Sequence, residues 1–560
     1  LNLEVLIAKL KRLPIKRKIF MSKIDQFKEE LTTGYTFKGD SITLGGAKYE
    51  GEGVPGIHVK VPLKTLNRHG LIAGATGTGK TKTLQVIAEQ LSEKGIPSVL
   101  MDIKGDLSGL AAPGTMNDFI DKRHKAMDLP YEPKAMPVEL MTLSEGKGTR
   151  LKATVTEFGP VLLSKILGLN DTQGSVISLV FMYCDNNKLP LIDLKDLRKT
   201  LQYLMDEGKE ELEKEYGTIS SSTVGIIMRK VIELEQQGAE QFFGERSFDP
   251  QDLIRVDKNG KGIISIIRLM DIQGKPKLFS TFMLSLMAEI YNTFPEEGDS
   301  DKPKLCIFID EAHLVFEEAS SALMDQLEVI IKLIRSKGVG IFFCTQNPID
   351  VPDSILSQLG LKVQHALRAF TEKDRTAIKK AAQNYPITEF YKTDEIITQM
   401  GTGEALVSAL NEKGVPTPLA VTICRAPLTR MDVLEESEVD ELVKNSFIAA
   451  KYNEEIDRES AYEILSKKID KAASVEQQEK KNSDQDKELA ELQKAEAKRN
   501  AERQKEIERL KKIQVREDKA KAAENEKLWK DITRGATRKT KDNSLFGVLA
   551  RGILGVLGVK

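Results

Sequence analysis

Short apolar runs alternate with longer helical stretches through much of the chain. The runs lie at 70–73, 98–101, 262–267, 305–309 and 339–344. Continuous apolar runs of this length are typical of strands that are buried on both faces of a parallel sheet. Their alternation with helical periodicity predicts an α/β fold with a mainly parallel sheet.

A long helical stretch divides this pattern into two parts. Residues 115–260 lose the alternation, and their apolar residues recur at helical spacing. We therefore expect a large, mostly helical insertion at 115–260, which splits the sheet core into 67–114 and 261–430. Ahead of the core, residues 21–66 contain short alternating runs between glycines and prolines, which predict a small β element.

The hydrophobic pattern nearly disappears after residue 430. Residues 431–470 carry 12 acidic and 5 basic side chains, and 35 of the 70 positions in 471–540 are charged. Such a segment cannot bury a core, so we expect a charged C-terminal arm at 431–543 that is helical, coiled or disordered. Five apolar residues allow a weak coiled coil, although no strict heptad holds for three cycles: Leu489, Leu492, Ile507, Leu510 and Ile513.

The two ends of the chain have their own patterns. Residues 1–20 are basic and Met21 looks like an ordinary translation start, so we expect 1–20 to be a non-native extension from too far upstream. The alternative is a targeting segment, but the charges follow the apolar residues and no small-residue cleavage site appears. Residues 544–560 form an apolar tail, which is too short to span a bilayer. We expect this tail to dock onto a partner or a neighbouring subunit, with interfacial membrane contact as the alternative.

Composition excludes several classes of protein. The 560 residues include 83 Lys and Arg against 84 Asp and Glu, so a formal charge of −1 points neither to nucleic acid nor to a membrane. The four cysteines form no CxxC pair, which excludes a disulfide framework and a zinc ribbon and suits a reducing cytosol: Cys184, Cys306, Cys344 and Cys424. No apolar run reaches the roughly 20 residues of a membrane helix. We therefore expect a cytoplasmic protein without a transmembrane segment.

A glycine-rich loop follows the first apolar run and opens a helix. It satisfies the phosphate-loop pattern G-x-x-x-x-G-K-[ST], the Walker A motif, with Gly74, Ala75, Thr76, Gly77, Thr78, Gly79, Lys80 and Thr81. Glycines let successive backbone N–H groups face one anion, and the helix N-terminus adds its dipole. Lys80 would neutralise the β and γ phosphates of ATP, and the Thr81 hydroxyl would bind Mg²⁺. The alternative is a plain glycine turn before a helix, but the strand and helix beside the loop favour nucleotide binding.

Two carboxylates follow the apolar run at 305–309, as in a Walker B motif. Asp310 would hold Mg²⁺, and Glu311, one residue further on, would point to the other side and orient the attacking water. The alternative is a pair of acidic residues that caps the next helix. Because a phosphate loop precedes the pair, we expect ATP hydrolysis rather than nucleotide binding alone.

Other polar residues are candidates for supporting roles. Gln346 follows the run at 339–344, at the edge of the sheet where ligands of open α/β sheets bind, and would sense the γ phosphate. Three arginines are candidates for stabilising the transferring phosphoryl group, either within the subunit or across a subunit boundary, with a surface salt bridge as the alternative for each: Arg335, Arg368 and Arg375. Asp102 ends the run at 98–101 and would either support the Mg²⁺ site or cap a turn.

These motifs together resemble the HerA-like branch of the HerA/FtsK P-loop ATPases. The resemblance rests on the Walker A loop, on Asp310-Glu311-Ala312-His313 and on the stretch from 334 to 348. It extends to further segments, at 158–160, 242–245, 364–370 and 403–407, and so covers about residues 35 to 430 and recurs at 551–555.

The resemblance implies a RecA-like ATPase core, hexameric rings with ATP at the subunit interfaces, and motor activity on double-stranded DNA. An arginine such as Arg368 would then complete the site of a neighbouring subunit, and a nuclease or another protein would be a partner. Archaeal HerA carries a β-barrel domain before its ATPase, but at most about 50 residues separate Met21 from the loop here, too few for a typical domain of that kind.

The sequence therefore predicts a Mg²⁺-dependent ATP hydrolase that acts as an oligomeric DNA translocase or helicase-like motor. The alternative is a nucleotide-gated assembly or binding protein with slow, DNA-independent ATP turnover. A third hypothesis is a membrane-associated secretion or conjugation motor, because related ATPases serve there and the tail is apolar.

Overall fold

The computed structural model describes residues 21–524 except 273, 299, 317–320 and 370. The expected extension 1–20, the last part of the expected arm and the tail 544–560 lie outside the described residues. The chain divides into two units, one that ends at Ile469 and one that begins at Asp470.

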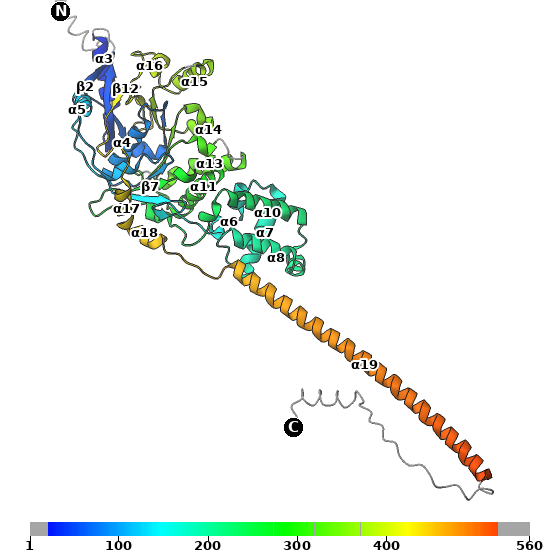
Figure 1. The fold of residues 1–560 in the computed structure, drawn as a ribbon. Helices are drawn as coiled ribbons and strands as arrows, with labels where there is room; N and C mark the ends of the chain where they lie inside the picture. Colours follow the sequence, from blue (N-terminus) through cyan, green and yellow to red (C-terminus); the bar gives the residue numbers. More distant parts are fainter. Residues whose placement is uncertain (1–20, 273, 299, 317–320, 370, 525–560) are drawn as a thin grey trace, which may run out of the picture. The chain divides into compact units, whose positions relative to one another are not determined.

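A twelve-stranded sheet runs through the first unit (Figure 1). Its order is β2-β1-β12-β11-β10-β3-β9-β8-β4-β7-β5-β6, with parallel pairing from β10 to β6 and antiparallel pairing from β2 to β10. The prediction of an α/β fold with a mainly parallel sheet is confirmed. The strands are β1 Ser41–Tyr49, β2 Glu52–Pro62, β3 Gly70–Ala73, β4 Ser98–Asp102, β5 Val138–Thr142, β6 Thr149–Arg150, β7 Ile264–Arg268, β8 Leu305–Ile309, β9 Val339–Thr345, β10 Leu361–His365, β11 Glu404–Ser408 and β12 Ala420–Cys424.

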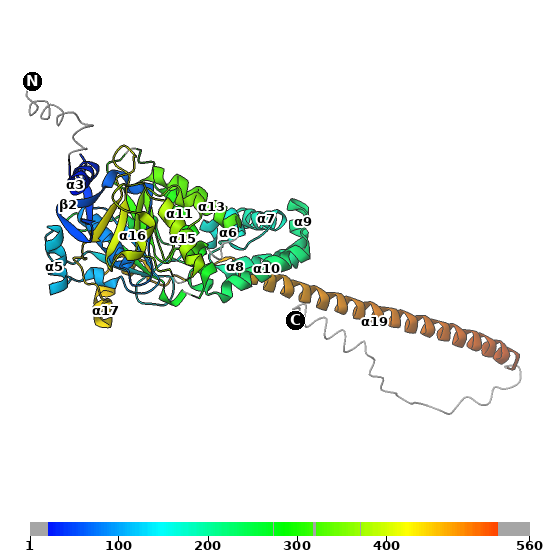
Figure 2. The same ribbon diagram turned by 90° about the horizontal axis from the view of Figure 1, so that it is seen from above.

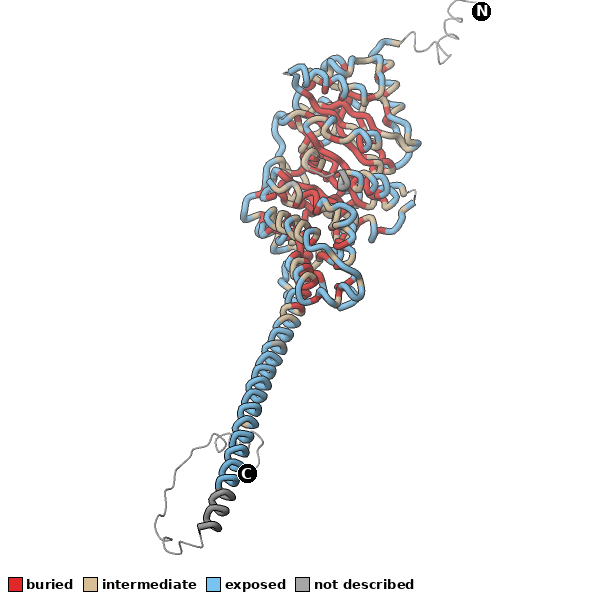
Figure 3. Tube along the Cα trace, turned by 90° about the vertical axis from the view of Figure 1, so that its right-hand side faces the viewer, coloured by how far each residue is buried: buried red, intermediate tan, exposed pale blue. Residues whose placement is uncertain are grey.

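The central strands are buried on both faces, because successive side chains point to opposite sides of a sheet. In β9, Ile341 and Phe343 belong to one apolar cluster, and Phe342 and Cys344 belong to another. Helices α11 and α13 pack into the first cluster, whereas α4 packs into the second. The buried strands therefore form a continuous interior layer (Figure 3).

Helices surround the sheet and extend beyond it. Their bounds are α3 Lys23–Gly34, α4 Lys80–Glu93, α5 Asp118–Met127, α6 Val155–Ile166, α7 Asp171–Asn187, α8 Leu194–Met205, α9 Lys209–Tyr216, α10 Ser221–Gln236, α11 Pro276–Thr293, α12 His313–Phe316, α13 Ser321–Ile334, α14 Asp353–Leu356, α15 Glu372–Gln383, α16 Thr393–Gln399, α17 Glu436–Lys444, α18 Phe447–Tyr452 and α19 Ala461–Glu524. No helix among the described residues has both the length and the apolar character needed to cross a membrane.

The region expected as a helical insertion, 115–260, combines two kinds of structure. Helices α6 to α10 form a group beside α11 and α13 (Figure 2). Strands β5 and β6, however, belong to the main sheet, where β5 pairs with β7. Glu139 interrupts the apolar pattern of β5 and is held there by Arg255 and Ser446. The segment between the core halves therefore adds two strands to the sheet, between α5 and the helical group α6 to α10.

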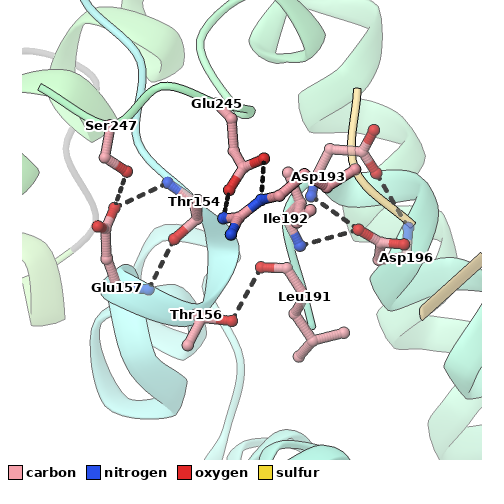
Figure 4. Close-up of polar contacts among 10 residues, drawn as sticks. Thr154, Thr156, Glu157, Leu191, Ile192, Asp193, Asp196, Glu245 and Ser247 are labelled. Carbon is pink, nitrogen blue, oxygen red and sulfur yellow. Dashed lines mark hydrogen bonds and ion pairs between the residues drawn. The ribbon is translucent and has the colours of Figure 1, made fainter. Parts of the chain in front are cut away.

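Polar contacts hold the helical group together around the start of α8 (Figure 4). The Asp193 carboxylate accepts a hydrogen bond from the Asp196 backbone N–H at 3.0 Å, and the Asp196 carboxylate accepts one from the Asp193 backbone N–H at 3.1 Å. The second Asp196 oxygen accepts from the Ser460 hydroxyl at 2.5 Å, just before α19. Glu245 forms an ion pair with Arg458 nearby. These contacts fix the beginning of α19 within the first unit.

The segment expected as the charged arm, 431–543, is divided between the two units. Residues 431–469 belong to the first unit, where Tyr452 is buried and donates to Asp252 at 2.6 Å. The rest of α19 belongs to the second unit, and its described part is one continuous helix with almost entirely exposed side chains (Figure 3). From Ala461 to Glu524 the helix has 64 residues, which corresponds to roughly 96 Å at 1.5 Å per residue.

Candidate active site

The glycine-rich loop curls between β3 and α4. Gly74, Gly77 and Gly79 have φ angles of 155°, 76° and 114°, a region that side chains rarely adopt. A Cβ atom at Gly74 would lie 2.5 Å from the Cβ of His365, so a larger residue has no room there. The loop therefore has the tight, N–H-lined shape that binds a chain of phosphates.

Lys80 begins α4 and lies folded into the loop. Its Nζ donates to the carbonyl oxygens of Gly74 at 2.6 Å and Ala75 at 3.2 Å, and the side chain is buried. Burial lowers the pKa of Lys80, while the negative charges of Glu311 and Asp310 oppose that shift. The loop thus holds a positive charge that interacts electrostatically with the two carboxylates that follow β8, two strands away from β3 in the sheet.

Asp310 follows β8 and is 3% exposed. Its Oδ2 has no hydrogen-bond partner among the described residues, and burial raises the pKa of Asp310 to about 6 although Lys104 opposes that rise. An unpartnered, buried carboxylate oxygen that interacts with the phosphate-loop lysine fits a hard divalent cation with oxygen ligands. Thr81, in the first turn of α4, carries a hydroxyl directly after Lys80. The residues present therefore fit Mg²⁺.

Glu311 occupies a strained backbone position with a φ of 45°. Its carboxylate is paired with Lys104 through Oε1 and lies 3.3 Å from His313 Nδ1 through Oε2. Burial favours a higher pKa for Glu311, but the hydrogen bond and charge of Lys104 outweigh it and hold the pKa below its usual value. Glu311 is therefore a carboxylate whose charged form is favoured and whose orientation is set by Lys104, from the turn after β4.

Lys104 was not identified from the sequence, and Asp102 takes one of its two expected roles. Asp102 accepts hydrogen bonds from the backbone N–H groups of Gly105 at 2.7 Å, Asp106 at 3.2 Å and Leu107 at 3.2 Å. It therefore caps the turn after β4, and this turn carries Lys104 towards Glu311. The sequence predicts a polar strand end at residues 102–106. It does not indicate that Lys104 in this segment pairs with Glu311, which follows another strand.

His365 and Gly403 support the loop from the neighbouring strands. The buried His365 bonds the Thr83 hydroxyl at 2.9 Å through Nε2 and the Glu404 carbonyl at 2.9 Å through Nδ1. Gly403 N–H donates to the Thr78 carbonyl at 2.8 Å. Spacing gave no reason to select these residues, although both lie in segments that carried the family resemblance.

Gln346 and Arg368 lie at the same edge of the sheet as the phosphate loop. Gln346 is exposed directly after Thr345, whose carbonyl accepts from Gly74 N–H at 3.2 Å. Arg368 follows β10, two residues after Ala366, and donates to the Thr398 carbonyl at 3.1 Å. Arg375 is further along, in the first turn of α15. The structure therefore places Gln346 directly after a residue that bonds the loop, and Arg368 two residues after Ala366, whose carbonyl accepts from Ala75 N–H at 2.9 Å.

Arg335 lies at the opposite edge of the sheet. It precedes β9, whereas the loop follows the parallel strand β3. Arg335 lines a cleft of about 670 Å³ that contains four more basic residues: Lys64, Arg68, Lys332 and Lys413. The seven residues of β9 separate Arg335 from the Gln346 edge. Arg335 therefore cannot reach the phosphate loop of its own chain.

Among the described residues, the side chains that typically bind transition metals do not gather into a site. Groups of three or more His, Cys, Asp or Glu side chains that would hold a metal ion are absent from the described part of the chain. The four cysteines are free and buried, and burial raises the pKa of each. Thiolate chemistry therefore has no part in this site.

Comparison with known proteins places similar sequences among helicases. A family profile described as "Helicase HerA-like C-terminal" matches residues 48–560. The "DNA double-strand break repair helicase HerA" of Sulfolobus acidocaldarius is 21% identical over 424 residues, which covers 72% of this chain and 73% of the relative. A "Probable helicase MJECL08" of Methanocaldococcus jannaschii is 24% identical over 431 residues, 69% of this chain and 71% of the relative.

Among solved structures, plasmid coupling protein TrwB in complex with a non-hydrolysable ATP analogue is similar at a TM-score of 0.49. Its sequence is 16% identical, and the match covers 72% of this chain and 95% of that chain.

Proposed function

The chain belongs to the family of helicase HerA-like C-terminal domains, and we propose that it is a Mg²⁺-dependent ATP hydrolase that drives an oligomeric motor along double-stranded DNA. One observation carries the proposal most strongly. The Lys80 loop and the Asp310-Glu311 pair, 230 positions apart in sequence, interact electrostatically at one edge of the sheet. This combination supports hydrolysis, because a loop alone would support only binding.

Each residue of the site has a role that follows from its position. The loop N–H groups bind the phosphates of ATP, and Lys80 exchanges its two carbonyl contacts for phosphate oxygens. Thr81 and Asp310 would hold Mg²⁺, which neutralises phosphate charge when bound. Glu311, kept ionised by Lys104, orients and polarises the attacking water. Gln346 senses the γ phosphate at the end of β9.

The two arginines act in different ways because they lie at opposite edges of the sheet. Arg335 cannot reach its own loop, so it acts on the nucleotide of a neighbouring subunit, with the basic cleft around it facing that subunit. Arg368 is at the loop edge of its own chain and serves there. This assignment requires an oligomer, because the site is incomplete without Arg335 of a second copy.

The test is the rate of ATP hydrolysis with and without double-stranded DNA over a series of salt concentrations. A DNA motor should be stimulated by DNA at low salt, and the stimulation should decrease steeply as salt rises, because phosphate contacts release counterions. Hydrolysis that is slow and independent of DNA at every salt concentration would favour the nucleotide-gated assembly protein instead.

A further inference from the structure

The part of α19 that belongs to the second unit carries a stripe of mostly uncharged residues along an otherwise highly charged helix. We call the following ten positions the arm stripe: Gln478, Asn482, Gln485, Leu489, Leu492, Glu496, Asn500, Arg503, Ile507 and Leu510. Two of the ten positions are charged, against 16 of the other 23 positions between 478 and 510. Successive members are three or four residues apart, so all lie on one face of the helix.

The stripe has the geometry of a coiled-coil seam with one irregularity. Spacings of four and three alternate, except that two spacings of four follow each other from Leu492 to Glu496 to Asn500. An insertion of this kind unwinds a coiled coil locally without ending it. The extra spacing of four also interrupts the strict heptad repeat of this segment.

The apolar members of the stripe face solvent in the single chain. Leu489 is 50% exposed, Leu492 40%, Ile507 49% and Leu510 58%. Burying them against another helix would remove apolar surface from water, which is the main favourable term in association. The seam therefore requires a partner with a matching face.

The order of residues in the stripe identifies that partner. Leu489 and Leu510 are equally far from the midpoint between Arg499 and Asn500, and so are Leu492 and Ile507. Glu496 and Arg503 form a third such pair. When two such stripes run in opposite directions about this midpoint, each branched apolar residue therefore lies opposite a branched apolar residue, and each cation lies opposite an anion.

We propose that two copies of this chain pair through the arm stripe as an antiparallel coiled coil centred between Arg499 and Asn500. Leu489 then packs on Leu510 of the partner, Leu492 packs on Ile507, and Glu496 faces Arg503. In this arrangement, each of the two charged layers pairs a glutamate of one copy with an arginine of the other. A parallel pair in register would place Glu496 on Glu496 and Arg503 on Arg503, which are repulsive layers. Asn500, a polar residue near the centre of the seam, fixes the register.

The first test uses single cysteine substitutions in the full-length protein. Differently tagged copies that carry Leu489→Cys and Leu510→Cys are co-expressed and treated with a short bis-maleimide. The antiparallel pair should give roughly tenfold more cross-linked product between the two tags than either variant gives with itself, because identical positions lie far apart in it. The wild-type protein sets the background, since its four cysteines are buried.

A matched control uses Ala490→Cys with Arg509→Cys. These positions are equally far from the same midpoint but lie off the stripe, so this pair should cross-link poorly. Cross-linking of the Leu489→Cys protein with itself would indicate a parallel pair and overturn the proposal. Equal or absent cross-linking in both mixtures would overturn it as well, in favour of a solitary helix or a different partner.

The second test exchanges the charged layer in the background of the productive cysteine pair. Glu496→Arg alone, and Arg503→Glu alone, should lower the cross-linking yield severalfold, because each creates two like-charged layers. The double variant E496R/R503E should restore the yield, because each layer again joins opposite charges. Failure of the double variant to recover would exclude the antiparallel register even if the arms associate in some other way.

Discussion

At the phosphate-loop edge, several polar groups are held by residues from other parts of the sheet, whereas along the described part of α19 beyond Asp470 the side chains lie in solvent. Glu311 and Thr83 depend on partners that are distant in sequence, whereas Lys80 is held by carbonyl groups of its own loop. The edge can therefore be disrupted from far away along the chain, and the arm contributes little to the folding of the first unit. The two regions therefore call for different measurements. The rate of ATP hydrolysis tests the phosphate-loop edge, and association between copies of the chain tests the arm.

The largest effect should come from removing the loop cation. Lys80→Ala should lower ATP turnover by at least about 100-fold, because the charge that stabilises the transferring phosphoryl group is lost. The melting temperature should change little, since the loop glycines and strands remain. Lys94→Ala, at the end of the same helix, is the control and should keep wild-type turnover. Unchanged turnover in Lys80→Ala would remove the assignment of the site.

A smaller effect should follow from freeing Glu311. Lys104→Met should reduce kcat by about 10- to 100-fold with little change in KM, because the carboxylate loses the contact that orients it. Lys104→Arg should restore most of the rate. Lys134→Met is a matched control, since Lys134 has similar exposure and pairs with Glu93 away from the loop. Equal rates in Lys104→Met and Lys134→Met would show that Glu311 needs no such contact.

The buried histidine of the edge should make stability depend on pH. Burial lowers the pKa of His365 to about 4, whereas in the unfolded chain it takes up a proton near 6.5. As pH falls from 7 to 5, protonation therefore favours the unfolded chain, and the folded state loses about 2 kcal/mol through this residue.

Replacing His365 should remove that contribution. The melting temperature of His365→Asn, measured at pH 7 and pH 5, should fall by less between the two than that of the wild-type protein. His58→Asn, at a partly buried position in β2, is the control for the His-to-Asn substitution itself. Parallel pH curves for His365→Asn and the wild-type protein would contradict this explanation.

The smallest effect should come from shortening the arm. A chain that ends at residue 475 should melt within about 1 °C of the full-length protein, because substitutions and contacts at exposed positions contribute little to stability. A chain that ends at residue 460 loses Ala461 and Leu465, which are 0% and 1% exposed within the core, and should melt several degrees lower. A large loss of stability in the longer chain would show that the two regions depend on each other.

The sequence predicted the parts of the site that are contiguous. The phosphate loop and the Asp310-Glu311 pair each combine a buried apolar strand with a fixed run of polar residues, and such local patterns determine local structure. The placement of Gln346 at the loop edge also followed, because the carboxyl ends of parallel strands share one edge. The specific contact that each side chain makes stays a prediction until it is measured.

Other features depend on pairings that no local pattern encodes. Lys104 meets Glu311 because β4 and β8 are neighbours in the sheet, and His365 meets Thr83 because β10 lies beside β3. Strand β5 was hidden within the expected insertion because Glu139 breaks its apolar run, and the buried glutamate is stable there only through residues far along the chain. The order of the strands in the sheet, which tertiary packing determines, brings these residues together and places β5 in the sheet.

The carbonyl oxygens of Gly74 and Ala75 give the loop an internal ligand for Lys80. An incoming nucleotide has to exchange these bonds for phosphate contacts, and a departing product restores them. Under the proposed function, the exchange weakens the binding of substrate and product by a similar amount, so it raises the dissociation constants of ATP and ADP together and leaves the chemical step unaffected.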